Sequence, residues 1–243
     1  MNVLTGRANN STETRAAPTG PTRFDFSRSA LQAFQLCVLR GRTGCGKTSV
    51  LNALATLGCQ TLDLERLARH RGSAFGAVGM QRQPSHTEFL QRLHVHWEAF
   101  DQAAPLFVEF AGGYLGSLAI PLELAQQIHR TDWIKLVATE SHRAESIAAI
   151  YAGLGQQRLL AATKRLRGRF PPESLARVRK AIRQQRYQDA VCLLLPYYDA
   201  AYDHQMEEAE GRCLFTLDVN GLSPLQVAAA ILHKLELAEH AAD

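Results

Sequence analysis

The chain has 243 residues, of which 46% are hydrophobic and 21% are charged, and its net charge at pH 7 is +4. This composition is typical of a globular protein with a sizeable core, and no apolar run approaches the roughly 20 residues that a membrane span needs. We therefore expect a cytoplasmic protein without a membrane segment. Its five cysteines lack the spacing of a zinc or redox motif, which argues against a metal knuckle: Cys37, Cys45, Cys59, Cys192 and Cys213.

Residues 1–30 are expected to form a disordered leader. The stretch from Met1 to Gly20 is rich in Ser, Thr, Asn, Pro and Gly, and it contains no apolar segment of the kind found in a signal peptide. We expect no cleaved targeting sequence there.

Apolar strands alternate with helical patterns along the rest of the chain. The run from Ala33 to Leu39 predicts a first strand, and Ser49 to Leu57 has the spacing of a helix. Further strands are predicted at Gln60–Leu64, Pro105–Glu109, Trp133–Ala138 and Arg212–Leu217. Further helices are predicted at Thr87–Ala103, Pro121–Arg130, Arg143–Leu154, Pro172–Gln185, Tyr187–Tyr202 and Pro224–Glu239. This alternation predicts an α/β fold like that of P-loop NTPases, a mostly parallel sheet flanked by helices.

Residues 156–205 contain no convincing strand pattern, so we expect a helical subdomain there. It would be inserted into a P-loop α/β domain formed by residues 31–155 and 206–243. The first half of the insertion is strongly basic, with nine Lys or Arg residues between Lys164 and Arg186 against the single acid Glu173. An anionic partner would bind to this part of the chain.

The segment Gly41-Arg42-Thr43-Gly44-Cys45-Gly46-Lys47-Thr48 has the Walker A spacing of a P-loop. Glycines let backbone N–H groups turn toward phosphate oxygens, and the following helix presents its positive end to the same charge. Lys47 would reach the outer phosphates, and the Thr48 hydroxyl would be a ligand of Mg²⁺. A chance match in a turn is the alternative, but this loop leaves an apolar strand and enters a helix, as a true site requires. The predicted phosphate-binding residues are Gly41, Thr43, Gly44, Cys45, Gly46, Lys47 and Thr48.

Carboxylates follow two of the predicted strands. Glu109 ends the strand at Pro105–Glu109, and Asp63 ends the second strand, with Glu65 close behind it. Such acids hold a metal, position water or deprotonate an acceptor hydroxyl at phosphate sites, so we predict catalytic roles for Glu109 and Asp63. An acid at a strand end is also found as a solvated terminus or a helix cap, and the sequence leaves that alternative open.

An unusual combination of residues follows the second predicted strand. It begins with Leu62-Asp63-Leu64-Glu65-Arg66-Leu67-Ala68-Arg69-His70-Arg71-Gly72-Ser73-Ala74-Phe75-Gly76 and continues with Gln83-Pro84-Ser85-His86. A third part lies much later in the chain, at Leu193-Leu194-Leu195-Pro196-Tyr197-Tyr198-Asp199. Together with the phosphate loop, these residues resemble the P-loop domain of tRNA 2-selenouridine synthase. The resemblance covers most of residues 36–205.

The resemblance implies an enzyme that modifies tRNA at wobble 2-thiouridine, through an S-geranylated intermediate and then selenophosphate. In that family a rhodanese domain, whose cysteine carries the selenium chemistry, precedes the P-loop domain. Forty residues precede Gly41 here, which are too few for that domain. We therefore expect a separate rhodanese partner, or geranyl transfer alone. The segment from Phe110 to Tyr114 lacks the acidic and basic pair usual in the family, so substrate contacts there are expected to differ.

The loop after the second strand is predicted to be an anion clamp. Arginine supplies forked donors and glycine permits close backbone approach. The alternative is a surface loop with two solvated arginines. The predicted clamp residues are Arg69, His70, Arg71, Gly72 and Ser73.

The basic run suits RNA phosphates, so tRNA is the expected partner. The alternative is a solvated helix face, which is the usual fate of a charge run. The predicted RNA-binding residues are Lys164, Arg165, Arg167, Arg177, Lys180 and Arg183.

The sequence is compatible with three functions. The first is tRNA modification, and the second is an ATP-dependent small-molecule kinase in which Asp63 or Glu109 activates a hydroxyl for attack on a γ-phosphate. The third is a nucleotide-dependent binding protein without catalysis. The expected ligand is ATP, another nucleoside triphosphate or geranyl diphosphate, together with Mg²⁺.

Overall fold

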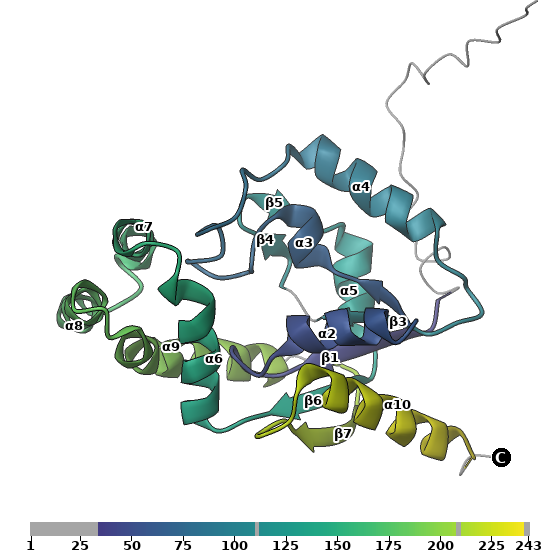
Figure 1. Ribbon diagram of the computed structural model, residues 1–243. Coiled ribbons are helices and arrows are strands. Elements are labelled where there is room, and N and C mark those ends of the chain that lie inside the picture. Colours follow the sequence, from purple (N-terminus) through teal and green to yellow (C-terminus); the bar gives the residue numbers. More distant parts are fainter. Residues whose placement is uncertain (1–33, 110–111, 208–209, 241–243) are drawn as a thin grey trace, which may run out of the picture.

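A five-stranded parallel sheet forms the centre of the molecule (Figure 1). The computed structural model describes residues 34–109, 112–207 and 210–240. The strands are β1 (Leu36–Arg40), β2 (Gln60–Leu62), β3 (Leu106–Glu109), β6 (Trp133–Val137) and β7 (Cys213–Asp218), in the order β2-β3-β1-β6-β7. This arrangement confirms the predicted α/β fold with a parallel sheet.

The two faces of the sheet carry separate apolar clusters. In β1, Leu36 and Val38 belong to one cluster, and Cys37 and Leu39 belong to the other, because successive side chains of a strand point to opposite faces. All five residues of β1 are buried, as expected for the central strand of a parallel sheet that is covered on both sides.

Helices cover both of these faces. The cluster of Leu39 includes residues of α2 (Lys47–Thr56) and α10 (Pro224–His240). The cluster of Val38 includes residues of α3 (Leu64–Ala68), α4 (His86–Glu98), α5 (Leu122–Arg130) and the small hairpin β4 (Tyr114–Leu115) and β5 (Leu118–Ala119). The helices thus cover the faces of the sheet, and the loops at the carboxyl ends of its strands are where a ligand of such a sheet binds.

A group of helices follows β6 and lies beside the sheet, at the left of Figure 1. It comprises α6 (Glu140–Ala152), α7 (Gln156–Ala162), the 3₁₀ helix η1 (Thr163–Leu166), α8 (Pro172–Arg183) and α9 (Tyr187–Glu207). The apolar cluster of these helices contains Leu175, Val178 and Leu194, and it also contains Phe75 and Val78 from the loop after α3. The helical insertion is therefore packed against the rest of the chain, and the division into two domains stays a prediction.

Side-chain caps move two boundaries away from the predicted ones. β2 ends at Leu62 because the Asp63 side chain caps α3, a short helix that the sequence patterns did not indicate. α6 begins before Arg143 because the Thr139 hydroxyl accepts the N–H of His142. Among the described residues, no helix is long and apolar enough to cross a membrane. The predicted leader 1–30 lies outside the described residues, as do Phe110 and Ala111 of the segment expected to differ from the family.

Phe89 and Val95 lie on different sides of α4 and provide a test of its packing. Phe89 is fully buried and Val95 is 65% exposed. Phe89→Ala should lower the free energy of unfolding by about 3–5 kcal/mol, because it removes contacts and leaves a cavity. Val95→Ala should change it by less than about 0.5 kcal/mol. Urea denaturation followed by circular dichroism measures both values, and equal losses would contradict this packing.

Candidate phosphate-binding site

The phosphate loop connects β1 to α2 at the carboxyl edge of the sheet. From β1 the chain continues to β2 and β3 on one side and later to β6 on the other. Ligands of open parallel sheets bind where the strand order reverses in this way. Gly44 and Gly46 have φ values of 90° and 77°, in the left-handed region that glycine adopts without steric cost. A Cβ atom at Gly44 would also lie 2.8 Å from the Cβ atom of Arg143. The shape of the loop therefore requires glycine at this position.

The N-terminus of α2 points free donors at the loop. Its N-cap residue is Gly46, its first turn contains no acid, and no side chain of the described residues caps it. The first N–H groups of a helix have no partner within the helix, and the helix dipole makes this end positive. These groups can therefore bind phosphate oxygens.

Lys47, Thr48 and Glu109 meet beside the loop. Lys47 Nζ donates a hydrogen bond to the carbonyl oxygen of Gly41 at 2.8 Å. Thr48 Oγ1 donates to Glu109 Oε2 at 2.7 Å. The parallel register that pairs Leu39 with Glu109 places this carboxylate next to the loop. The structure thus brings Glu109 next to two residues of the phosphate loop, from which it is separated by about sixty residues in the chain.

Asp63 has the position of a helix cap. Its Oδ1 atom accepts the N–H of Arg66 at 2.8 Å, at the start of α3. This contact is the structural alternative that the sequence left open for Asp63. The catalytic role of Asp63 stays a prediction.

Glu65 is a candidate functional residue that the predicted site omitted. Burial, and then the negative charge of Glu109, raises the pKa of Glu65 to about 8, while the charge of Lys47 opposes this shift. Desolvation also raises the pKa of Glu109, against the effects of Lys47 and the Thr48 hydrogen bond. Aspartate is a common N-cap residue, so Asp63 could have indicated a helix that starts at Leu64. Glu65 would then have been placed in the first turn of that helix, as it is in α3.

The clamp loop borders this acidic group through two of its residues. A Cβ atom at Gly72 would lie 3.0 Å from Glu65 Oε1. Arg71 lies close enough to Glu65 to oppose the rise in its pKa. The guanidinium also donates to the carbonyl oxygen of Val78 at 2.9 Å and lies 5.8 Å from the ring centre of Tyr151. Arg71 and Gly72 are therefore placed to contact a ligand near Glu65.

The other clamp residues have structural contacts. Arg69 donates to the carbonyl oxygen of Arg82 at 3.3 Å, and Ser73 Oγ accepts the N–H of Phe75 at 3.2 Å. His70 is 7% exposed, and burial, followed by the charge of a nearby arginine, lowers its pKa. Its ring lies against Gly76, where a Cβ atom would come within 2.6 Å of His70 Cε1. His70 therefore packs inside the loop.

The six predicted RNA-binding side chains are all exposed: Lys164, Arg165, Arg167, Arg177, Lys180 and Arg183. The last three lie on α8, whose opposite side buries Val178 and Ile182. Arg165 also donates to the carbonyl oxygen of Ala74 at 3.1 Å, so the basic segment contacts the clamp loop.

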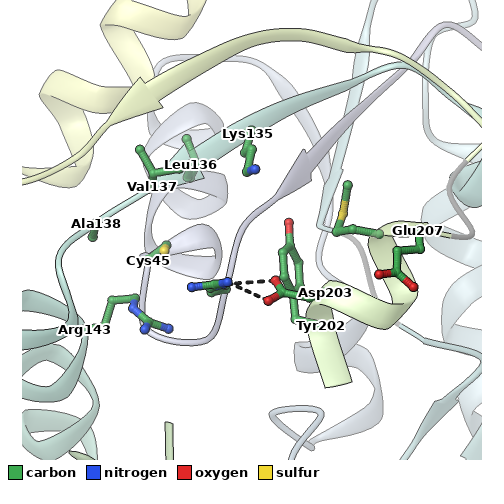
Figure 2. A pocket seen from close by; sticks show the side chains of 11 residues that line it. Cys45, Lys135, Leu136, Val137, Ala138, Arg143, Tyr202, Asp203 and Glu207 are labelled. Atoms are coloured by element: carbon green, nitrogen blue, oxygen red, sulfur yellow. Dashed lines mark hydrogen bonds and ion pairs between the residues drawn. The ribbon is translucent and has the colours of Figure 1, made fainter. Parts of the chain in front are cut away.

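A cavity of about 580 Å³ lies beside the start of the phosphate loop (Figure 2). Its lining includes Arg42, Cys45, Lys135, Arg143, Tyr202 and Asp203. Cys45 is 2% exposed, and burial raises the pKa of its thiol. A thiol that is buried and protonated is a poor nucleophile, so Cys45 is not placed to react with a ligand.

A parallel sheet with a glycine-rich phosphate loop after its central strand defines a P-loop α/β protein. Residues 34–192, more than half of the chain, match the family described as the tRNA 2-selenouridine synthase AAA domain, and the chain belongs to this family.

Similar curated proteins include two tRNA 2-selenouridine synthases. The one from Pseudomonas syringae pv. tomato is 33% identical over 224 residues, which cover 79% of this chain and 59% of that protein. The one from Marinobacter nauticus is 31% identical over 221 residues, which cover 78% and 59%. The chain thus spans about 59% of the length of these relatives. A shikimate kinase from Acinetobacter baumannii superposes with a TM-score of 0.38 at 16% identity over 88% of this chain and 98% of that one, which is too low to support an inference.

The raised pKa of Glu65 predicts a pH-dependent stability. Because the ordinary pKa is 4.5 and the folded value is about 8, the folded protein binds more protons than the unfolded chain between these values, and stability falls as pH rises through this range. Glu65→Gln should make this fall shallower by about 1–3 kcal/mol in ligand-free protein. The exposed Glu145→Gln is the control. Urea denaturation across this pH range measures the effect, and identical pH profiles for parent and Glu65→Gln would contradict it.

Proposed function

We propose that the loop from Gly41 to Thr48 binds the phosphates of a nucleoside triphosphate or of geranyl diphosphate. The observation that carries this proposal is the Thr48–Glu109 hydrogen bond beside an uncapped helix N-terminus. The N–H groups of α2 and the Lys47 ammonium would stabilise negative charge on the phosphates, both in the bound ligand and as the leaving group departs.

The same residues suit Mg²⁺. This ion binds through oxygen, and it commonly uses one or two carboxylates together with phosphate oxygens of the substrate. Among the described residues, no group of three or more His, Cys, Asp or Glu side chains is arranged to hold a metal. Thr48 and Glu109 would therefore hold the ion together with the ligand, and the ion would neutralise charge on the phosphates.

We propose further that the ligand serves the modification of tRNA at wobble 2-thiouridine, by transfer of a geranyl group or as part of its exchange for selenium. Family membership and the exposed basic residues beside the clamp loop support this proposal. We propose a separate rhodanese protein as the partner for the selenium step. Glu65, with a pKa near neutrality, would accept or donate a proton during transfer.

A small-molecule kinase is the second candidate, and the position of Glu65 supports it. A general base must lie near the hydroxyl that attacks the γ-phosphate, and Glu65 lies close to Lys47 and Glu109. Measurement of nucleotide hydrolysis with and without bulk tRNA separates the candidates. Stimulation by tRNA would favour tRNA modification, and hydrolysis that ignores tRNA would favour the kinase.

Lys47→Ala should abolish binding of both candidate ligands and leave the fold intact, because the ammonium faces the loop and not the apolar core. Lys234→Ala on α10, whose ammonium lies over the ring of Phe215, is the matched control. Calorimetric titration with Mg²⁺-ATP and with geranyl diphosphate measures binding. A Lys47→Ala protein that binds as tightly as the parent would show that the site is assigned wrongly.

Binding of tRNA should weaken steeply with salt, because Lys and Arg side chains that contact phosphates release counterions. Substitution of Arg177, Lys180 and Arg183 by Glu should weaken the binding of all tRNAs by a similar factor, since phosphate contacts carry no sequence information. Filter binding at low and moderate salt measures this. Undetectable or salt-independent binding by the parent would refute the RNA-binding surface and place the kinase first.

A further inference from the structure

Two carboxylates of α9 hold two arginines at the start of the phosphate loop. Asp199 and Asp203 are four residues apart and therefore lie on the same side of the helix. Arg143 donates to Asp199 through two hydrogen bonds of 2.7 Å. Arg42 donates to Asp203 through Nε at 3.1 Å and Nη2 at 2.6 Å, drawn as dashed lines in Figure 2. Both pairs have the forked geometry in which arginine binds a carboxylate most strongly.

The two pairs differ in their exposure to solvent. The side chains of Arg143 and Asp199 are 4% and 16% exposed, and Arg143 also donates to the carbonyl oxygen of Thr43 at 3.2 Å. Loss of one partner from such a pair leaves an unpaired buried charge, so the pair is a fixed support for the loop. The side chains of Arg42 and Asp203 are 45% and 49% exposed. A pair as exposed as this contributes little in water and can exchange partners.

Arg42 belongs to the phosphate loop, and its side chain lines the cavity beside the start of that loop, together with Cys45. Its Nη1 atom is 3.6 Å from Asp199 Oδ2, which Arg143 also binds. The planar guanidinium fits phosphate as well as carboxylate. A phosphate group that entered this cavity would compete with Asp203 for Arg42, whereas Asp199 would be retained by its buried partner Arg143.

We propose that Arg42 is a further phosphate-binding residue that changes partner when the ligand binds. Asp203 holds it in the ligand-free protein, and a phosphate group of the ligand replaces Asp203. This inference rests on the proposed phosphate site. The exchange releases the last turns of α9 from the loop, while Arg143 and Asp199 keep Thr43 in place. Ligand binding is thereby communicated to the helical segment that carries the basic residues.

Asp203→Asn removes the competing charge and keeps the size of the side chain. It should tighten the binding of Mg²⁺-ATP or geranyl diphosphate about twofold to fivefold, the factor that corresponds to one exposed ion pair. Asp189→Asn is the matched control, because Asp189 lies on the same helix, is 54% exposed and pairs with an arginine away from the loop. Calorimetric titration should find its affinity unchanged.

A double-mutant cycle separates this exchange from a general effect of charge. In an Arg42→Ala background, Asp203→Asn should no longer change the affinity, because the carboxylate acts through Arg42. The same gain with and without Arg42 would overturn the proposal. These side chains are half exposed, so the variants should keep the parent's circular dichroism.

Hydrogen exchange of α9 supplies an independent measurement. Ligand binding usually protects backbone N–H groups, but here it should speed exchange in residues 200–207 of the parent and not in Asp203→Asn. Binding with protection or no change in this segment would overturn this inference alone. If the parent binds neither Mg²⁺-ATP nor geranyl diphosphate, the phosphate-site proposal fails and this one fails with it.

Discussion

The parallel pairing of β1 with β3 is the constraint on which the candidate site depends. It sets Glu109 opposite Leu39, at the point where β1 enters the phosphate loop. Glu109 lies on the same face of the sheet as Phe107, whose cluster includes α2, because alternate residues of a strand share a face. A register shift of one residue would turn the carboxylate away from Thr48.

Charge is distributed unequally on the two sides of this loop. Glu65 and Glu109 lie on the side of β3 and α3, where burial and then the charge of Glu109 favour the protonated form of Glu65. Arg42 and Arg143 lie on the side of α9. The loop therefore has a group that can exchange protons on one side and, on the other, two arginines that are each paired with a carboxylate of α9. This arrangement is compatible with the proposed transfer, in which charge moves from the bond that breaks toward the phosphates.

Local patterns predicted the five strands of the sheet and the longer helices, but not α3, α7 or the hairpin of β4 and β5. Contacts between distant segments decided the details of the site. The phosphate loop and Glu109 were predictable because each is marked by its own strand and the residues next to it. The choice between Asp63 and Glu65 depended on a helix cap at the end of a strand of three residues, which short patterns do not resolve. Arg143 and Asp199 are 56 residues apart in the chain. Asp199 was part of the motif that indicated the family, but only the packing of α6 against α9 shows its partner.

The loop after α3 contacts two different parts of the folded chain. Its first residues border the acid group at Glu65, and its Phe75 and Val78 side chains are buried in the core of the helical segment. A chain from which residues 156–205 were cut out would expose more of both side chains and leave the loop with only the contacts of residues such as Tyr151. The insertion therefore cannot be exchanged for another one without an effect on the loop after α3. Any replacement has to supply its own pocket for these two side chains.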